Sequence, residues 1–141
     1  MRYKFLEHTA DVYIASYGTS IEEAFENAAL AFFEVMTDTD KVDPYLEEIV
    51  EIEEDDMKAL LYSWIEDLLL KFDIDRMIYS KFHVEQINTV NGKYTLKARI
   101  WGESFNERKH PSRTEVKAIT YHMMEISKRC NKIEIRFLLD I

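Results

Sequence analysis

Apolar positions in the first third of the chain predict two short strands followed by a helix. Residues 3–6 and 12–17 alternate as half-buried strands do. Ser20 and Glu23 have the spacing of a capping box, in which each side chain accepts from a backbone N–H that the first helical turn leaves unpaired. The apolar residues that follow have the i, i+3, i+4, i+7 spacing of one buried helical face: Ile21, Ala24, Phe25, Ala28, Ala29, Phe32 and Met36.

A polar loop, a strand and a second helix come next. Residues 37–44 carry several aspartates, but no glycine or spaced glutamate of a calcium loop accompanies them, so we interpret them as a turn. Residues 45–53 alternate as a strand with acidic positions toward solvent. Asp55 or Asp56 is the expected cap of the helix. Its apolar face comprises Met57, Leu60, Leu61, Trp64, Ile65, Leu68 and Phe72.

The second half of the chain has the pattern of antiparallel strands. Asn91-Gly92 is typical of a type I′ hairpin turn. Residues 115–126 fit both the alternation of a strand and the period of a helix. Their β-branched and aromatic residues favour a strand. Residues 102–113 are expected to form a polar loop. The predicted strands cover residues 78–89, 94–101, 115–126 and 132–139. This order of elements predicts an α+β fold in which two amphipathic helices pack on a mainly antiparallel sheet.

Composition and charge narrow the class of protein. A chain of 141 residues with 47% hydrophobic residues can bury a core, and we expect one domain over residues 1–141. The formal net charge of −9 opposes binding of a phosphate backbone and suits a basic protein partner or cations. The chain does contain a local group of basic residues, for which a solvated loop is the preferred interpretation: Arg108, Lys109, Arg113 and Lys117.

Cysteine content and apolar runs bear on the location of the protein. The single Cys130 excludes an internal disulfide and fits a reducing compartment. Neither a secretory leader nor an apolar run of membrane length is evident. We therefore expect a cytoplasmic protein without a membrane anchor.

Motifs of enzyme chemistry are missing from the sequence. It has no glycine-rich phosphate loop, no paired-cysteine metal motif and no nucleophile elbow. Each histidine could act as a base near neutral pH. We interpret His83 as a strand residue and His110 as a solvated loop residue. His8 and His122 have more polar neighbours, and a structural role remains the more common one for such residues.

One group of oxygen ligands can be formed if the two ends of the chain meet. Asp11 precedes a predicted strand, and the last apolar strand stops on Asp140, next to Ile141. The two carboxylates and the terminal carboxylate would suit Ca²⁺ or Mg²⁺ rather than zinc. The pattern alone leaves open that Asp11 is a turn-capping residue.

Several stretches, spread over nearly the whole chain, resemble the archease family. They are His8-Thr9-Ala10-Asp11-Val12, residues 19–25, Gly102-Glu103 with Lys109-His110, residues 116–122, and Asp140-Ile141. The chain departs from the usual family pattern at Tyr13, Ser104, Asn106 and Pro111. These differences concern details of the loop near residue 105 more than membership.

The resemblance implies an archease-like fold and a function without catalysis. Archease proteins are associated with tRNA splicing and resemble activators of RtcB-type RNA ligases. They promote guanylylation of the ligase, support multiple turnover and broaden nucleotide use. The implied partner is such a ligase, with only an indirect association with tRNA and weak or no direct binding of nucleic acid. The resemblance also implies a divalent cation, Ca²⁺ in the first place, held by Asp11, Asp140 and oxygens of Ile141.

Two other classes of function remain open at this stage. A metal-dependent hydrolase would use His8 or His122 as a base beside a metal held by Asp11, but no dense ligand set is evident. An RNA-binding or chaperone module would use the basic residues of the loop. Salt-dependent RNA binding by the isolated protein would indicate the latter.

Overall fold

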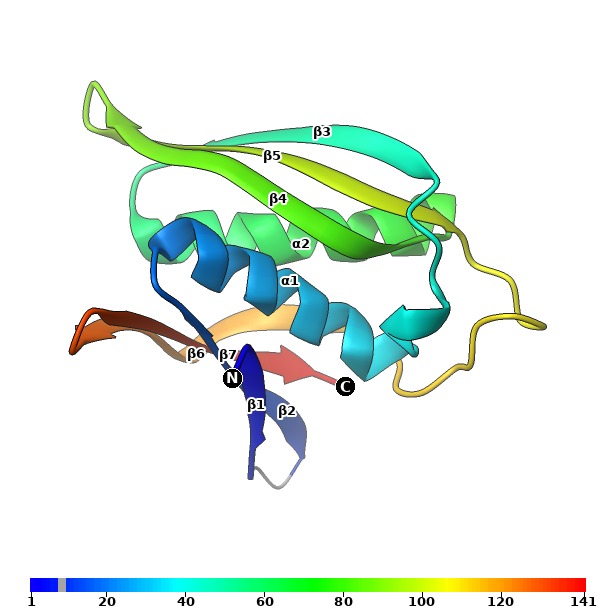
Figure 1. The fold of residues 1–141 in the computed structure, drawn as a ribbon. Coiled ribbons are helices and arrows are strands. Elements are labelled where there is room, and N and C mark those ends of the chain that lie inside the picture. The colour runs from blue at the N-terminus through cyan, green and yellow to red at the C-terminus, as the bar shows by residue number, and fades with distance from the viewer. Residues whose placement is uncertain (8–9) are drawn as a thin grey trace.

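Two antiparallel sheets enclose two helices in the computed structural model, which describes residues 1–7 and 10–141 (Figure 1). The prediction of two helices on antiparallel strands is confirmed, and the strands divide into two sheets. In chain order the elements are β1 (Tyr3–Leu6), β2 (Asp11–Gly18), α1 (Ile21–Met36), the 3₁₀ turn η1 (Thr39–Lys41), β3 (Leu46–Glu54), α2 (Met57–Asp75), β4 (Met77–Val90), β5 (Lys93–Ser104), β6 (Ala118–Arg129) and β7 (Lys132–Asp140).

The two sheets draw their strands from different parts of the chain. One sheet has the order β1-β2-β7-β6, so the first strands pair with the last ones. The other has the order β3-β5-β4 and uses the middle of the chain. In Figure 1 this second sheet lies above the helices and the first sheet lies below them. The pairing of β2 with β7 brings the two ends of the chain together.

Helix α1 is buried on more than one side because it lies between the sheets. The capping box is present: Ser20 Oγ accepts from the Glu23 amide at 3.1 Å, and Glu23 Oε1 accepts from the Thr19 amide at 2.8 Å. The predicted apolar face is largely buried, and so are residues outside it, including Leu30 and Phe33. A helix that is apolar nearly all round is a helix with packing partners on both sides.

Helix α2 begins at the Asp56 cap, whose carboxylate accepts from the Ala59 amide at 2.8 Å. Trp64, on the apolar face of α2, is fully buried. The Trp64 indole Nε1–H donates to the carbonyl of Phe25 at 3.0 Å and so joins the two helices. The apolar face of α2 is thus packed in the interior, as its spacing predicts.

Strand β5 continues through Ser104, so the prediction that residues 102–104 belong to a loop is wrong. The reason is the close approach of Gly102 to β4. A Cβ atom at Gly102 would lie 1.9 Å from the carbonyl oxygen of Ile78, so only glycine fits there without a shift of the strands. The extension carries Glu103 out to the end of the sheet. The hairpin at Asn91-Gly92 is present, with φ angles of 52° and 76°.

Candidate functional site

Asp11 and Asp140 lie directly opposite each other in the first sheet. The register of β2 and β7 pairs Asp11 with Asp140 and Val12 with Leu139. Residues that face each other in an antiparallel pair project from the same side of the sheet, with Cβ atoms about 4.5–5.5 Å apart. The two carboxylates are therefore brought together by strand pairing between residues at opposite ends of the chain.

The pair belongs to the outer side of the sheet, away from the helices. Ile14 and Ser16 lie three and five residues after Asp11 in β2, so their side chains project from the opposite side of the strand. Ile14 is fully buried, and Ser16 Oγ donates to the carbonyl of Ala24 in α1 at 3.1 Å, so this set of residues faces the helices. Since side chains alternate along a strand, Asp11 and its partner Asp140 face outward. Asp140 is exposed to solvent.

The main chain around Asp140 is fixed on its other side by the start of β6. Asp140 pairs with Ala118, and its carbonyl oxygen accepts from the Lys117 amide at 2.8 Å. That carbonyl is thus already engaged. A cation at this position would be held by the carboxylates of Asp140 and Asp11 and by the oxygens of Ile141.

This donor set fits a hard divalent cation with several open positions. In the described part of the chain, no three His, Cys, Asp or Glu side chains converge as a complete metal site. Ca²⁺ takes six to eight oxygen ligands, so two carboxylates and Ile141 would leave room for water or for oxygens of a partner. His8 and Thr9 of the predicted motif lie outside the described residues.

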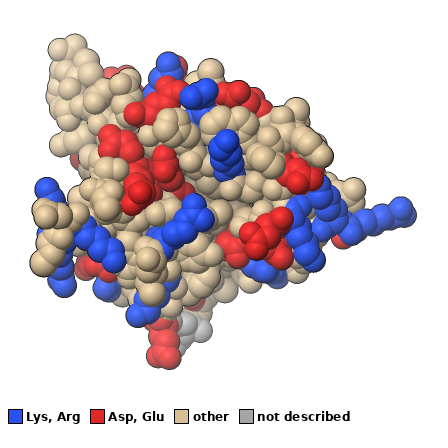
Figure 2. Space-filling view, viewed as in Figure 1, with Lys and Arg blue, Asp and Glu red and all other residues tan. Residues whose placement is uncertain are grey.

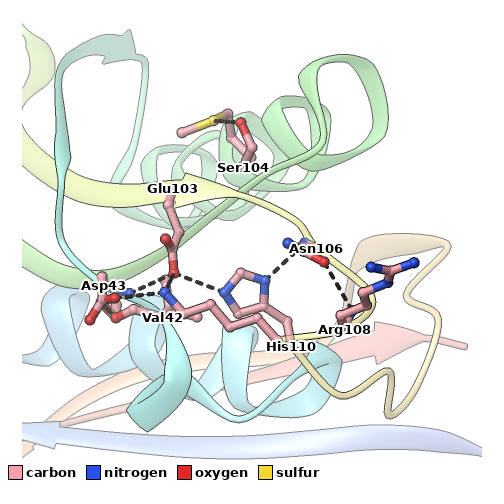
Figure 3. Close-up of polar contacts among 10 residues, drawn as sticks. Val42, Asp43, Glu103, Ser104, Asn106, Arg108 and His110 are labelled. Carbon is pink, nitrogen blue, oxygen red and sulfur yellow. Dashed lines mark hydrogen bonds and ion pairs between the residues drawn. The ribbon is translucent and has the colours of Figure 1, made fainter.

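A second polar cluster joins the end of β5 to the loop that follows it (Figure 3). Glu103 Oε2 accepts from the Asp43 amide at 2.8 Å and from Lys109 Nζ at 2.7 Å, and it lies 2.9 Å from His110 Nε2. Lys109 Nζ also lies 2.6 Å from Asp43 Oδ2. The cluster fixes the loop against the segment that precedes β3.

His110 is buried, with 1% of its surface exposed, so the prediction of a solvated histidine is wrong. Its Nδ1 accepts from the Asn106 amide at 2.9 Å, which assigns the proton to Nε2, where it is donated to Glu103. The Phe105 ring also stacks on the imidazole at 5.8 Å. Since the basic lone pair of His110 is already used by a backbone amide, this Glu–His pair is structural and is not arranged as a general base.

Hydrogen bonds in this cluster hold the Glu103 carboxylate in its ionised form. Burial acts to raise the pKa of Glu103. The hydrogen bonds from Lys109, the Asp43 amide and His110 outweigh burial and lower the pKa to about 2. Hydrogen bonds to the carboxylates of Asp43 and Glu103 raise the pKa of Lys109. The ionised state of Glu103 thus contributes to the stability of the folded loop.

Acid should therefore remove a contribution of Glu103 to stability. Its folded-state pKa of about 2 lies below the usual 4.5, so the contribution is complete above pH 4.5 and is lost as pH falls toward 2. The free energy of unfolding of native protein and of Glu103→Gln, measured by urea denaturation from pH 7 to pH 2.5, should differ most at pH 7 and converge in acid. Glu107→Gln, an exposed change in the same loop, is the control. A difference that stays constant with pH would contradict this account.

Two basic residues of the loop are engaged by acidic side chains rather than exposed as an open phosphate-binding patch. Lys109 is paired with Glu103 and Asp43, and Arg113 Nη1 lies 3.0 Å from Glu34 Oε2. Arg113 also donates to the carbonyl of Glu34, near the end of α1. On the face shown in Figure 2, basic and acidic side chains are interspersed. Lys109 and Arg113 therefore serve the packing of the loop.

Two further histidines occupy different settings. His83 lies in β4, as predicted, and its Nδ1 is 3.6 Å from Glu26 Oε2. His122 is exposed in β6, and its amide donates to Thr120 Oγ1 at 3.1 Å. The contacts of His83 are thus with α1, away from the acidic pair. No helix in the described part of the chain is long and apolar enough to cross a membrane.

Two solved structures share the fold of this chain. A helix pair enclosed by two antiparallel sheets is the fold shared with a solution structure of protein 1598 from Methanobacterium thermoautotrophicum. The two structures agree with a TM-score of 0.86 and 42% sequence identity, over 99% of this chain and 98% of that one. A crystal structure described as an archease, possible chaperone, from Thermotoga maritima shares the fold, with a TM-score of 0.59 at 21% identity over 100% of this chain and 98% of that one.

Sequence comparison gives the family. The Archease protein family (MTH1598/TM1083) matches residues 3–141. The chain is 48% identical over 140 residues to protein archease of Sulfurisphaera tokodaii and 50% identical over 143 residues to that of Sulfolobus acidocaldarius. In each comparison the match covers 99% of both chains. The chain belongs to the archease family.

Proposed function

We propose that this chain is a non-enzymatic activator of an RtcB-type RNA ligase, which promotes guanylylation and multiple turnover of the ligase in tRNA splicing. Membership of the archease family supports this assignment. The structural observation that carries it is the pairing of Asp11 with Asp140 on the outer side of a sheet. Two outward carboxylates beside Ile141 can reach a site on another protein, whereas a substrate pocket of this chain would enclose them.

The absence of catalysis is inferred from the chemistry of the described side chains. His110, the buried histidine next to a carboxylate, has its Nδ1 occupied by the Asn106 amide. The sequence offers no phosphate-binding loop and no nucleophile beside a base. The chain therefore suits a helper that changes the environment of a reaction carried out elsewhere.

Asp11, Asp140 and oxygens of Ile141 are the groups proposed to hold a divalent cation, Ca²⁺ in the first place. A bound cation at this position would supply positive charge next to the phosphate groups of a nucleotide. The two carboxylates would set its position through the pairing of β2 and β7. The Lys117 amide would keep Asp140 in place through its hydrogen bond to the carbonyl oxygen.

The net charge supports a protein partner with a basic surface. A chain with a formal charge of −9 is attracted to the basic groove that an RNA ligase requires and is repelled by RNA itself. The association with tRNA would then pass through the ligase. This arrangement fits a cytoplasmic protein, as the sequence predicts.

The proposed function is tested by guanylylation of a purified RtcB-type ligase from the same source. With GTP and a divalent metal, added native chain should increase the rate at which guanylylated ligase forms. The isolated chain should neither join RNA ends nor hydrolyse GTP. An unchanged rate across a titration of the chain, or sustained GTP hydrolysis by the chain alone, would contradict the proposal.

Assays of the purified chain alone distinguish two other functions from the proposed one. A metal-dependent hydrolase would turn over nucleotide without the ligase. An RNA-binding or chaperone module would bind RNA with an affinity that falls as salt rises. Because the Thermotoga maritima structure is described as a possible chaperone, general chaperone activity is also worth assaying, by suppression of aggregation of an unrelated protein.

A further inference from the structure

Strand β6 contains a large irregularity a few residues after the acidic pair. Thr120 pairs with Leu138, and the next pair in the ladder joins Glu125 to Arg136. Residues 121–124 therefore lie opposite Phe137 alone. Such bulges interrupt pairing at the edge of a sheet and redirect side chains, often beside functional sites. We call residues 121–124 the β6 bulge.

The β6 bulge is held in a defined conformation by hydrogen bonds that involve side chains. Met123 has a φ of 60°, a left-handed conformation that is uncommon for a residue with a side chain. Its carbonyl accepts from the Tyr13 hydroxyl at 2.8 Å, and Thr120 Oγ1 accepts from the His122 amide at 3.1 Å. An unfavourable backbone conformation that the surrounding structure maintains is a reason to look for function.

The β6 bulge displays apolar side chains at the surface. Tyr121 is 53% exposed and Met123 is 43% exposed. The Tyr121 ring stacks on Tyr62 of α2, with centroids 4.4 Å apart and an interplanar angle of 9°. Exposed tyrosine held rigid by stacking gives a large contact area at a small cost in conformational entropy. A hollow of about 480 Å³ lies beside it, lined by Asp56, Met57, Lys58, Tyr121 and Ile126.

The surroundings of the Tyr121 hydroxyl are predominantly acidic. Burial is the largest cause of a raised pKa of Tyr121, and the charges of Asp56, Glu54 and Glu66 raise it further. Lys58 is the basic side chain that lines the hollow. The patch thus combines an exposed aromatic ring with carboxylates. A guanidinium group suits both, because it stacks on aromatic faces and pairs with carboxylates in a planar fork.

We propose that the β6 bulge is a docking surface for a basic patch of the partner ligase, with an arginine of the ligase stacked on Tyr121 and paired with Asp56. The identity of the partner rests on the proposed function. A second copy of this chain is a poor occupant, since two copies would bring the same carboxylates together at a net charge of −9 each.

The docking surface lies a short distance along β6 from the acidic pair. Asp140 pairs with Ala118, and Tyr121 follows three residues further along β6, about 10 Å at the rise of an extended strand. Tyr121 lies on the side of the sheet that faces α2, whereas Asp11 and Asp140 face outward, and β6 is the edge strand between the two sides. A ligase that reaches around this edge would contact both the docking surface and the acidic pair. Docking would orient the acidic pair, while the acidic pair would act on the nucleotide.

The experiment measures the affinity of purified ligase for the chain by calorimetry. Tyr121→Ser should weaken binding about tenfold or more, as loss of an interface aromatic commonly does. Tyr121→Phe, which keeps the ring, should bind nearly as the native chain does. Asp56→Asn should weaken binding and make it less dependent on salt, because asparagine retains the helix cap and removes the charge. Tyr45→Ser is the control, as Tyr45 is 75% exposed elsewhere on the surface.

A further variant separates docking from folding. Met123→Gly suits the left-handed backbone and removes the exposed side chain. The variant should therefore remain folded but bind the ligase more weakly than the native chain does. Ca²⁺ affinity should stay unchanged in all of these variants. Tyr121→Ser and Met123→Gly proteins that bind as tightly as Tyr45→Ser would overturn the docking surface alone. A native chain that neither binds nor activates the ligase would overturn the proposed function, and this inference with it.

Discussion

Replacing Asp140 with asparagine should reduce the affinity of the chain for Ca²⁺ by about a hundredfold. Even groups that only support a metal ligand change affinity tenfold to a hundredfold when removed, so the loss of a direct ligand should lie at the upper end of that range or beyond. The cause is specific to this site. Asp11 supplies the opposing carboxylate in the β2–β7 register, so loss of Asp140 halves the charge that this pair offers to a cation.

Calorimetric titration with Ca²⁺ measures this effect directly. Asp11→Asn should show a comparable loss, whereas Glu51→Gln, an exposed change on β3 that alters net charge equally, should not. The melting temperatures of the Asp11 and Asp140 variants without metal should stay near that of the native protein, because both substitutions are small. Equal Ca²⁺ affinity in all four proteins would remove the proposed cation site.

Trp64→Ala should lower the free energy of unfolding by about 3–5 kcal/mol, the range for removal of a large buried aromatic side chain. Trp64 is fully buried and its indole N–H reaches the Phe25 carbonyl, so the substitution leaves a cavity between the helices and removes a donor from that carbonyl. Urea denaturation followed by far-ultraviolet circular dichroism provides the measurement.

Trp101→Ala is the matched control for this change. Trp101 is half-buried in β5, with Lys81 Nζ 4.6 Å from its ring centroid, so its removal should cost far less than that of Trp64. Stimulation of the ligase by Trp64→Ala should follow the folded fraction of the protein. A stable Trp64→Ala protein that has lost stimulation selectively would show that the helix pair takes part in function.

The position of most elements can be predicted because their signals are local. The capping box at Ser20 and the Asn91-Gly92 turn act over a few residues, and both are observed. The division into two sheets is not local. Burial of Phe33 outside the predicted face of α1 results from a second sheet that covers the helix from the other side. The turn at Cys130-Asn131 lacks the usual signal, since it adopts positive φ angles without glycine.

The candidate site, too, depends on long-range contacts that the sequence does not reveal. An apolar strand that ends on Asp140 suggests a meeting with Asp11, but the register that makes them direct partners depends on the whole β2–β7 ladder. The burial of His110 has no signal in its neighbourhood, because one of its partners, Glu103, is fixed by the distant Asp43 amide. The β6 bulge is hidden for a related reason: Tyr13, which holds it, is 110 residues away in sequence.

The rate of ligase guanylylation in a single turnover tests the central claim most directly, namely that Asp11 and Asp140 are the working groups of an activator without its own catalysis. The assay compares the native chain, the double variant Asp11→Asn/Asp140→Asn and Glu51→Gln, each shown to be folded and present at saturating concentration. The native chain and Glu51→Gln should accelerate guanylylation, and the double variant should leave it at the rate of the ligase alone. Full acceleration by a folded double variant would contradict the account.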